Sequence, residues 1–231
     1  MEYVGNNAFG VLTSAPDGRI ISIVFDFVTF VLQDFEGKKD YNENHLTNEL
    51  CKQLGFKKPP EYPFFFQHQN EEDAKKNTST DFAAFGTYAY AQTYDKSGEE
   101  FPLVKFEAKR LSSTLPKIRE KEYVIGEYKK DERIKNSGGI ERFKNLRHGK
   151  NVNHAAMIGY VQTDTFDDWT KKIKRWIKAE IKNPHDSALT WDADDYLQSQ
   201  WSKGRLCCFL SKPKRKKGKV LHMNHLWVML S

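Results

Sequence analysis

The residues best placed to do chemistry in this chain are a glutamate and a lysine separated by one residue. Glu107, Ala108 and Lys109 close an apolar run that has the composition of a β-strand. Because residues i and i+2 of a strand point to the same face, Glu107 and Lys109 should project side by side while Ala108 turns into the packing. A carboxylate beside an ammonium group forms either a surface ion pair or part of a catalytic site, and this triplet alone does not decide between them.

An aspartate earlier in the sequence could lie close to this pair in the folded protein. Asp81 follows the polar segment 70–80, which is predicted to be a loop, and opens a predicted strand over residues 82–91. If this strand and the one over residues 103–110 form a hairpin, Asp81 and Glu107 can lie at one end of the sheet. A strict register centred near Ser97 would not place them opposite one another, so the arrangement requires a bulge or an uneven loop.

A third acid comes from a helix predicted over residues 42–54 and ended by Gly55. Glu43 lies on the same side of this helix as the apolar stripe formed by Leu46, Leu50 and Leu54. An acid on such a stripe needs a partner, because burial of an unpaired carboxylate is costly. The equal alternative is that Glu43 only favours the helix N-terminus. Glu49 points about 120° away and is the second choice for the same role.

Composition limits the class of protein to which this chain can belong. The chain has 231 residues, 39% hydrophobic and 13% aromatic, which excludes disorder, collagen and coiled coil, and it carries a net charge of +6. We expect a single domain over residues 1–231, with a core at about 40–182 and a C-terminal extension at 183–231. Three cysteines without a C-x-x-C pair predict a reduced, cytoplasmic protein. The apolar run 20–32 is too short to span a membrane and should form a core helix or strand, or a dimer surface.

The order of expected elements favours an α/β fold with a mixed sheet flanked by helices. Further strands are expected at 62–68 and 155–161, and a short helix at 140–146. The clearest helix runs from Phe166 to Ile181, with Thr165 as N-cap and Asp168 three residues later. Residues 206–210 and 220–230 should form a C-terminal hairpin across the lysine-rich loop 212–219.

Common nucleotide-binding, zincin and hydrolase-elbow motifs are absent from the sequence. The order of a helix acid, an aspartate that opens a strand, and a Glu-x-Lys triplet instead resembles the PD-(D/E)XK nuclease superfamily, over about residues 40–182. The matching segments are Glu43-x-x-x-Thr47-x-x-Leu50, Thr80-Asp81-Phe82 and Phe106-Glu-Ala-Lys109. Thr80 stands where the name-giving proline would be. Residues 139–143 and 157–162 look like the helix and strand that follow the core in small bacterial members.

This resemblance implies a restriction-endonuclease-like α/β/α core and a Mg²⁺-dependent deoxyribonuclease, with Mn²⁺ as a substitute. Asp81, Glu107 and the backbone carbonyl of Ala108 would be the metal ligands. Lys109 would orient or deprotonate the attacking water, with a pKa that a nearby metal could lower. Glu43 would bind a second ion or orient Lys109. Gln162 could touch the scissile phosphate or a metal-bound water, although an ordinary polar residue at a strand end is the stronger alternative.

Two basic segments are expected to contact DNA phosphates. The nucleic-acid-binding candidates among them are Arg142, Lys144, Arg147, Lys150, Lys214, Arg215 and Lys216, with His148 and His154 nearby. Solvated charged surfaces are the alternative for both segments. Histidines 222 and 225 should point to opposite faces of the last strand and so cannot share a metal.

The resemblance also implies a role in restriction or anti-phage defence, with a homodimer or a defence-system protein as partner and no membrane. Two other functions stay open. One is a catalytically silent module that binds nucleic acid or protein with the same fold. The other is an unrelated α/β protein in which Glu107 and Lys109 form a surface pair.

Overall fold

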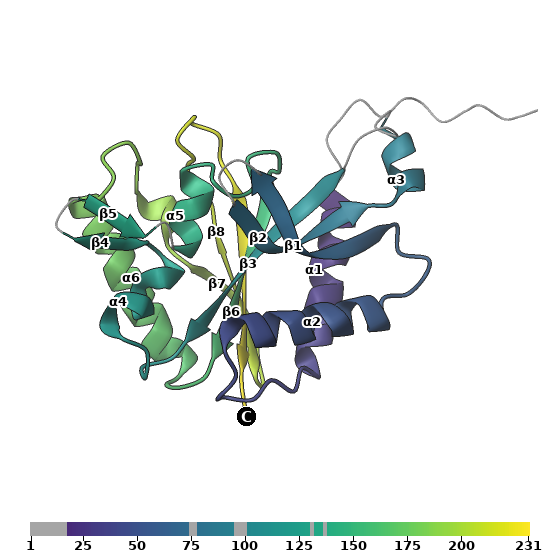
Figure 1. The fold of residues 1–231 in the computed structure, drawn as a ribbon, viewed down its shortest axis with the longest axis horizontal. Helices are drawn as coiled ribbons and strands as arrows, with labels where there is room; N and C mark the ends of the chain where they lie inside the picture. Colours follow the sequence, from purple (N-terminus) through teal and green to yellow (C-terminus); the bar gives the residue numbers. More distant parts are fainter. Residues whose placement is uncertain (1–17, 74–77, 95–100, 130–131, 136–137) are drawn as a thin grey trace, which may run out of the picture.

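The computed structural model describes residues 18–73, 78–94, 101–129, 132–135 and 138–231 (Figure 1). Within these residues, one mixed sheet has the strand order β1-β2-β3-β6-β9-β8-β7. In that order the strands span Phe64–Asp73, Thr78–Gly86, Pro102–Leu111, His154–Val161, His222–Met229, Leu206–Ser211 and Gln198–Lys203. β3, β6 and β9 run parallel in the middle, and antiparallel pairs extend the sheet on both sides. A separate ribbon pairs β4 (Glu127–Lys129) with β5 (Glu132–Lys135).

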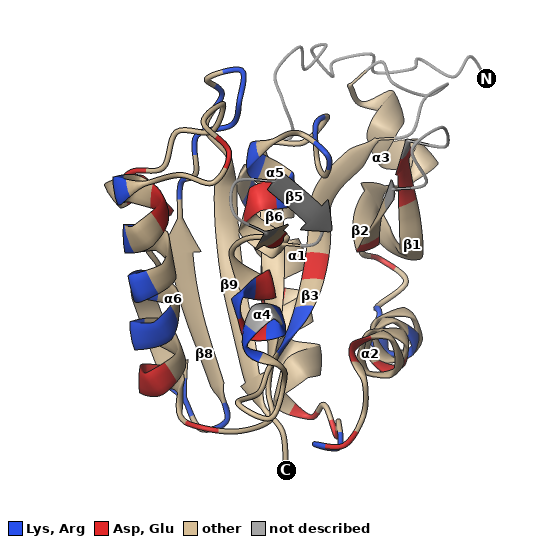
Figure 2. Ribbon diagram, turned by 60° about the vertical axis from the view of Figure 1, so that its left-hand side comes forward, with Lys and Arg blue, Asp and Glu red and all other residues tan. Residues whose placement is uncertain are grey.

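Helices cover both faces of the sheet, so the predicted α/β class with a mixed sheet is confirmed (Figures 1 and 2). The α-helices α1 to α6 span Gly18–Gln33, Glu43–Lys57, Tyr88–Gln92, Lys117–Glu120, Gly139–Lys144 and Phe166–Lys182, and the 3₁₀ helices η2 and η3 span Lys121–Tyr123 and Ala193–Asp195. One buried cluster joins α1 and α2 to one face of the sheet. A second cluster joins α5 and α6 to the other face. No helix in the described ranges combines the length and apolarity needed to cross a bilayer.

The helices follow the periodicity that predicted them. Leu46, Leu50 and Leu54 of α2 are fully buried against the sheet. Helix α6 begins with the expected capping box, in which Thr165 and Asp168 each satisfy the other's backbone N–H group. The run 20–32 forms α1, a helix whose one face is buried. β8 and β9 pair antiparallel on either side of the lysine-rich loop, which confirms the C-terminal hairpin.

The segment 70–80 was wrongly predicted to be a loop. β1 continues to Asp73 and β2 begins at Thr78, so most of this segment is strand. Two of its polar residues, Asn70 and Thr80, are buried and have partners in the sheet. The side chain of Asn70 accepts a hydrogen bond from Lys105 of β3, and Thr80 Oγ1 donates to the Asn70 carbonyl at 3.4 Å. Polar residues at these two positions are therefore compatible with a strand.

The strand predicted over residues 82–91 ends early, at Gly86. Thr87 then caps a short helix, α3, by accepting a hydrogen bond from the Tyr90 N–H group at 3.4 Å. Alanine and aromatic residues occur in both strands and helices. The hydrogen bond of the Thr87 cap therefore favours a helix after Gly86. The edge strand β7 was missed because all its residues are exposed and no apolar alternation marks it. Ser97, on which a strict hairpin register would be centred, lies outside the described ranges.

Candidate active site

The register of β2 and β3 brings Asp81 to Glu107. Phe82 pairs with Phe106, so the next position along each strand sets Asp81 opposite Glu107. A bulge between Ala84 and Phe85 shifts the register. Helix α3 also lengthens the connection between β2 and β3. The bulge and the longer connection together make the hairpin uneven, as the contact between Asp81 and Glu107 requires.

Beyond this pair the two strands separate and leave a fork. The β2–β3 pairing ends at Phe82 and Phe106, so the next N–H groups of β3 that face β2 have no strand partner. The Asp81 carboxylate accepts a hydrogen bond from the Ala108 N–H group at 2.6 Å. The Glu43 carboxylate accepts one from the Arg110 N–H group at 3.3 Å. Two acids from different elements thus replace the missing strand, because unpaired buried backbone groups are costly.

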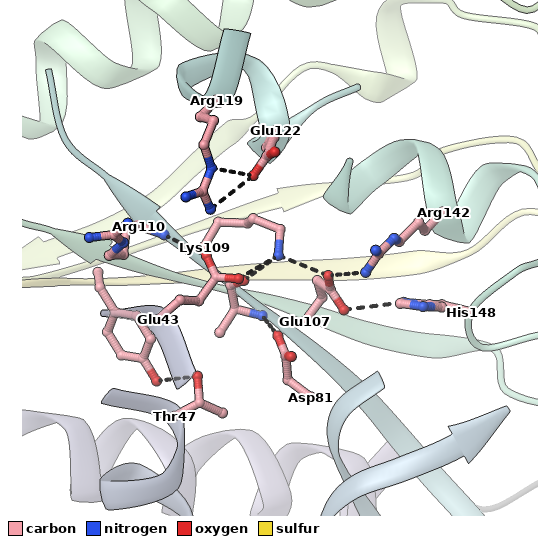
Figure 3. Close-up of polar contacts among 12 residues, drawn as sticks. Glu43, Thr47, Asp81, Glu107, Lys109, Arg110, Arg119, Glu122, Arg142 and His148 are labelled. Atoms are coloured by element: carbon pink, nitrogen blue, oxygen red, sulfur yellow. Dashed lines mark hydrogen bonds and ion pairs between the residues drawn. The ribbon is translucent and has the colours of Figure 1, made fainter. Parts of the chain in front are cut away.

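Strand alternation orients the Glu-x-Lys triplet as predicted. Phe106 stacks on Phe82 with ring centroids 4.3 Å apart and belongs, like Ala108, to the core on the α1–α2 face. Glu107 and Lys109 therefore point the other way and converge with Asp81 and Glu43 (Figure 3).

Glu107 lies at the centre of an ion-pair network. Its Oε1 atom is 2.9 Å from Lys109 Nζ and 2.8 Å from an Arg142 nitrogen. Its Oε2 atom faces His148 Nδ1 at 3.2 Å without an aligned hydrogen bond. Lys109 Nζ also lies 2.9 Å from Glu43 Oε1 and donates to the Ala108 carbonyl at 2.8 Å. The ammonium group of Lys109 therefore links two carboxylates and the backbone (Figure 3).

The pKa values of Asp81 and Glu107 are shifted in opposite directions. Burial and the charges of Glu107 and Glu43 raise the pKa of Asp81 to about 8, against the opposing effect of Lys109. Burial alone would also raise the pKa of Glu107, but Lys109, His148 and Arg142 lower it well below its usual value. Near neutral pH, Glu107 is an anion and Asp81 still holds its proton in a large share of molecules.

Lys109 is an ammonium ion in the metal-free site. Burial alone would lower its pKa, yet Glu107, Glu43 and Asp81 together raise it above the usual value. In this state Lys109 is suited to orient water and to stabilise negative charge, and not to accept a proton.

The oxygen atoms in the fork fit a hard divalent cation such as Mg²⁺ or Mn²⁺. Glu107 Oε2 is buried and accepts no hydrogen bond, which leaves lone pairs for an ion. In the described ranges, no three His, Cys, Asp or Glu side chains converge closely enough to hold a metal. An ion would thus need the two carboxylates of Asp81 and Glu107, the carbonyl of Ala108, and water.

The structure distinguishes the two candidate helix acids. Glu43 reaches the fork, whereas Glu49 forms an exposed ion pair with Lys52 at 2.7 Å. Gln162 does not point at the carboxylates. Its Nε2 atom donates to the carbonyls of Lys39 and Tyr41, at 2.7 and 2.9 Å, and so anchors the loop that leads into α2.

Two predicted phosphate contacts are instead structural, which corrects that part of the prediction. Lys144 is fully buried and pairs with Asp195. Arg215 is buried and donates to the carbonyls of Gly149 and Val152. Arg142 pairs with Glu107, but its side chain is 25% exposed, so its contact with a phosphate stays a prediction.

The other predicted phosphate contacts lie closer to the surface. Lys214 pairs with Asp192 at 2.9 Å. Arg147 is partly exposed, and Lys150 and Lys216 are exposed. Sequence reasoning placed Arg142 and His148 in a basic segment but missed their contact with Glu107, because spacing along the chain gives no sign of it.

The histidines of the last strand point to opposite faces, as predicted. His222 is exposed and stacks on His154 of β6 with ring centroids 5.3 Å apart. His225 is buried, with Nδ1 2.8 Å from the Tyr123 hydroxyl and Nε2 2.8 Å from the Ser211 hydroxyl.

One face of helix α1 is buried, and its outer side borders a groove lined by both apolar and polar residues. Phe25 and Phe30 of α1, Trp201 of β7 and Leu226 of β9 line this groove. Phe30 and Trp201 are 53% and 39% exposed. A dimer through α1 stays a prediction.

Comparison of the chain with protein-family models, curated proteins and solved structures gives no match. The fork, and the order of the elements that build it, are therefore the features from which a function can be inferred.

Proposed function

We propose that this protein is a metal-dependent nuclease that hydrolyses phosphodiester bonds of DNA. One observation carries the proposal: Asp81, Glu107 and Lys109 converge with Glu43 where β2 and β3 separate. Reactions at phosphodiesters require charge neutralisation and a positioned water, and this donor set suits both needs.

The order of the elements supports the same proposal. Helix α2, the antiparallel strands β1 to β3, helix α5 and the parallel strand β6 follow one another in the sequence. This is the succession expected of a restriction-endonuclease-like core. A role in restriction or anti-phage defence comes only from the resemblance in sequence and belongs to the proposal.

In this mechanism, Asp81, Glu107 and the Ala108 carbonyl would hold a Mg²⁺ ion, which supplies Lewis acidity toward the phosphate oxygens. Lys109 orients the attacking water and stabilises the charge that develops on the phosphate, as its ammonium state permits. Glu43 positions Lys109 through their 2.9 Å ion pair. Gln162 acts indirectly, by anchoring the loop that leads into α2, the helix that begins at Glu43.

A catalytically silent module that binds nucleic acid or protein is the second candidate. One observation favours it: Lys109 and Arg142 already lie within ion-pair distance of Glu107, so this carboxylate has positive partners without a metal ion.

Cleavage assays separate the two candidates. Supercoiled plasmid and single-stranded RNA are incubated with the protein and Mg²⁺, Mn²⁺ or EDTA. We expect metal-dependent DNA cleavage that falls at least about 100-fold in Asp81→Asn and Lys109→Ala. Glu49→Gln removes an acid from the same helix as Glu43, away from the fork, and should cut like the wild type.

DNA binding without cleavage, unchanged in Lys109→Ala, would support the silent module. Cleavage of RNA alone would overturn the DNA assignment.

A further inference from the structure

Two histidines stand side by side at the start of neighbouring parallel strands. His154 opens β6 and His222 opens β9, and the register of the two strands sets these residues directly opposite one another. Their imidazole rings stack with centroids 5.3 Å apart and an angle of 25° between the ring planes. His154 is partly exposed and His222 is exposed, so solvent reaches both rings.

This histidine pair lies on the other face of the sheet from the fork. Residues at alternate positions of the same strands, such as Ile158 and Leu226, belong to the cluster under α1 and α2. Glu107 points away from that cluster, because its neighbours Phe106 and Ala108 belong to it. A ligand of the two imidazoles would therefore bind apart from the carboxylates of the fork.

Neither imidazole of the pair has a competing partner among the described residues. No hydrogen bond or ion pair of these two rings is found there, and the stacking contact is their only ring contact. Three other histidines differ, because His148, His185 and His225 each face a carboxylate or a hydroxyl group within 3.2 Å. The nitrogen atoms of the pair are thus open to a ligand from solution.

The spacing of the two rings fits a tetrahedral metal ion. A Zn–N bond is about 2.0 Å long and the ring centre lies about 1 Å behind the nitrogen, so two imidazoles on one zinc ion have centroids about 5 Å apart. The observed separation of 5.3 Å is close to this value. Rotation of the side chains, which is soft about the second torsion of histidine, can turn one nitrogen of each ring toward a common ion without movement of the strands.

We infer that His154 and His222 form a second metal site, which binds a divalent transition-metal ion such as Zn²⁺. Imidazole nitrogen suits Zn²⁺, Ni²⁺ and Cu²⁺, whereas Mg²⁺ prefers oxygen ligands, so the site differs in chemistry from the fork. In the described ranges no third His, Cys, Asp or Glu side chain joins the pair, and water completes the coordination. The bound ion links the strand that follows the segment after α5 to the strand that follows the lysine-rich loop 212–219.

The test is a calorimetric titration of Zn²⁺ into the whole chain in excess Mg²⁺, which saturates sites made of oxygen ligands. His154→Gln and His222→Gln should each weaken Zn²⁺ binding at least about tenfold, because each variant removes one of two protein ligands. Zn²⁺ should also raise the midpoint of thermal unfolding of the wild type and leave that of both variants nearly unchanged.

His68→Gln is the matched control. His68 is also an exposed histidine on a strand of this sheet, but its neighbour across the register is Phe82. This variant should keep the wild-type affinity for Zn²⁺. Equal weakening in all three variants would indicate scattered contacts with surface histidines and would overturn the inference. Loss in only one of His154→Gln and His222→Gln, or no Zn²⁺ binding by the wild type, would overturn it as well.

A measurement on the wild type decides the question if either variant fails to fold, as judged by circular dichroism. Cu²⁺ added well below the protein concentration should broaden the imidazole NMR signals of His154 and His222 together, before those of the other histidines. Earlier broadening of any other histidine would contradict the proposed site. The outcome is independent of DNA cleavage, because the pair contributes no ligand to the fork.

Discussion

At Asp81, a backbone hydrogen bond favours the ionised carboxylate, whereas burial and neighbouring charges disfavour it. The carboxylate accepts a hydrogen bond from the Ala108 N–H group and thereby completes β3, yet it lies beside Glu107 and Glu43. Burial and these like charges raise its pKa to about 8, so ionisation of Asp81 opposes folding. Such tension is expected where acids are gathered for a purpose other than stability.

Replacement of Asp81 by Asn should therefore stabilise the protein in a pH-dependent way. In the folded state Asp81 holds its proton up to about pH 8, while the unfolded chain releases it near the ordinary pKa of an aspartate, 3.8. Stability of the wild type should thus fall as pH rises from about 4 to 8, and Asp81→Asn lacks this loss. We expect the variant to exceed the wild type by about 2 kcal/mol at pH 9 and by less at pH 5.

Urea unfolding at the two pH values measures the difference. Glu49→Gln serves as control, and its stability should parallel that of the wild type above pH 6, because the pKa of Glu49 is lowered by its hydrogen bond with Lys52. An Asp81→Asn variant that is less stable than the wild type at pH 9 would contradict this account.

At the level of elements, a buried ion pair joins α5 to the segment before β7. Lys144 ends α5 and pairs with Asp195 of η3, and neither side chain is exposed to solvent. The Asp195 carboxylate also accepts a hydrogen bond from the Asp192 N–H group at 2.8 Å. This pair fixes the helix that carries Arg142, so its role is architectural.

Removal of one partner should cost far more than removal of both charges. Lys144→Met leaves Asp195 buried without its cation, and we expect a loss of about 3 kcal/mol in the free energy of unfolding. The double variant Lys144→Met, Asp195→Asn keeps the acceptor for Asp192 and should recover more than half of that loss. Equal losses in the single and double variants, measured by urea unfolding, would show that the two side chains are not coupled.

Elements with local signals could be predicted from the sequence, and their pairing could not. The leucine stripe of α2 and the capping box of α6 are written within a few residues, so both were found. The position of Asp81 opposite Glu107 depends on a bulge near Ala84 that has no mark in the sequence. The side-chain oxygen of Asn70 accepts a hydrogen bond from Lys105, which lies 35 residues later in the sequence. Residues next to Asn70 carry no signal of this contact, so its place in a strand could not be predicted.

Over the whole molecule, hydrogen bonds join the two basic segments. Arg215 donates to the carbonyls of Gly149 and Val152, and the Lys216 N–H group donates to the Lys144 carbonyl at 2.8 Å. These bonds hold the lysine-rich loop 212–219 against the segment after α5, and Figure 2 shows its basic residues beyond the same end of the sheet as α5. The buried arginine thus anchors the loop, while the exposed lysines remain available to a polyanion.

DNA binding should depend on these lysines more than on net charge. The double variant Lys216→Glu, Lys217→Glu reverses two exposed charges of the loop, and Lys178→Glu, Lys182→Glu reverses two on the outer side of α6. We expect the loop variant to lose at least about tenfold in affinity and to show a shallower salt dependence. Titration of a labelled duplex at several salt concentrations measures both. Equal losses in the two variants would indicate binding by overall charge alone.

The position of β9 has a consequence for how the protein is made. This strand is formed by residues 222–229, yet it lies between β6 and β8 in the interior of the sheet. During synthesis on the ribosome, the fork at β2 and β3 emerges long before the strand that closes both hydrophobic clusters beside it. A nascent chain interrupted before His222 would expose those clusters, so we expect the cell to degrade it or chaperones to bind it.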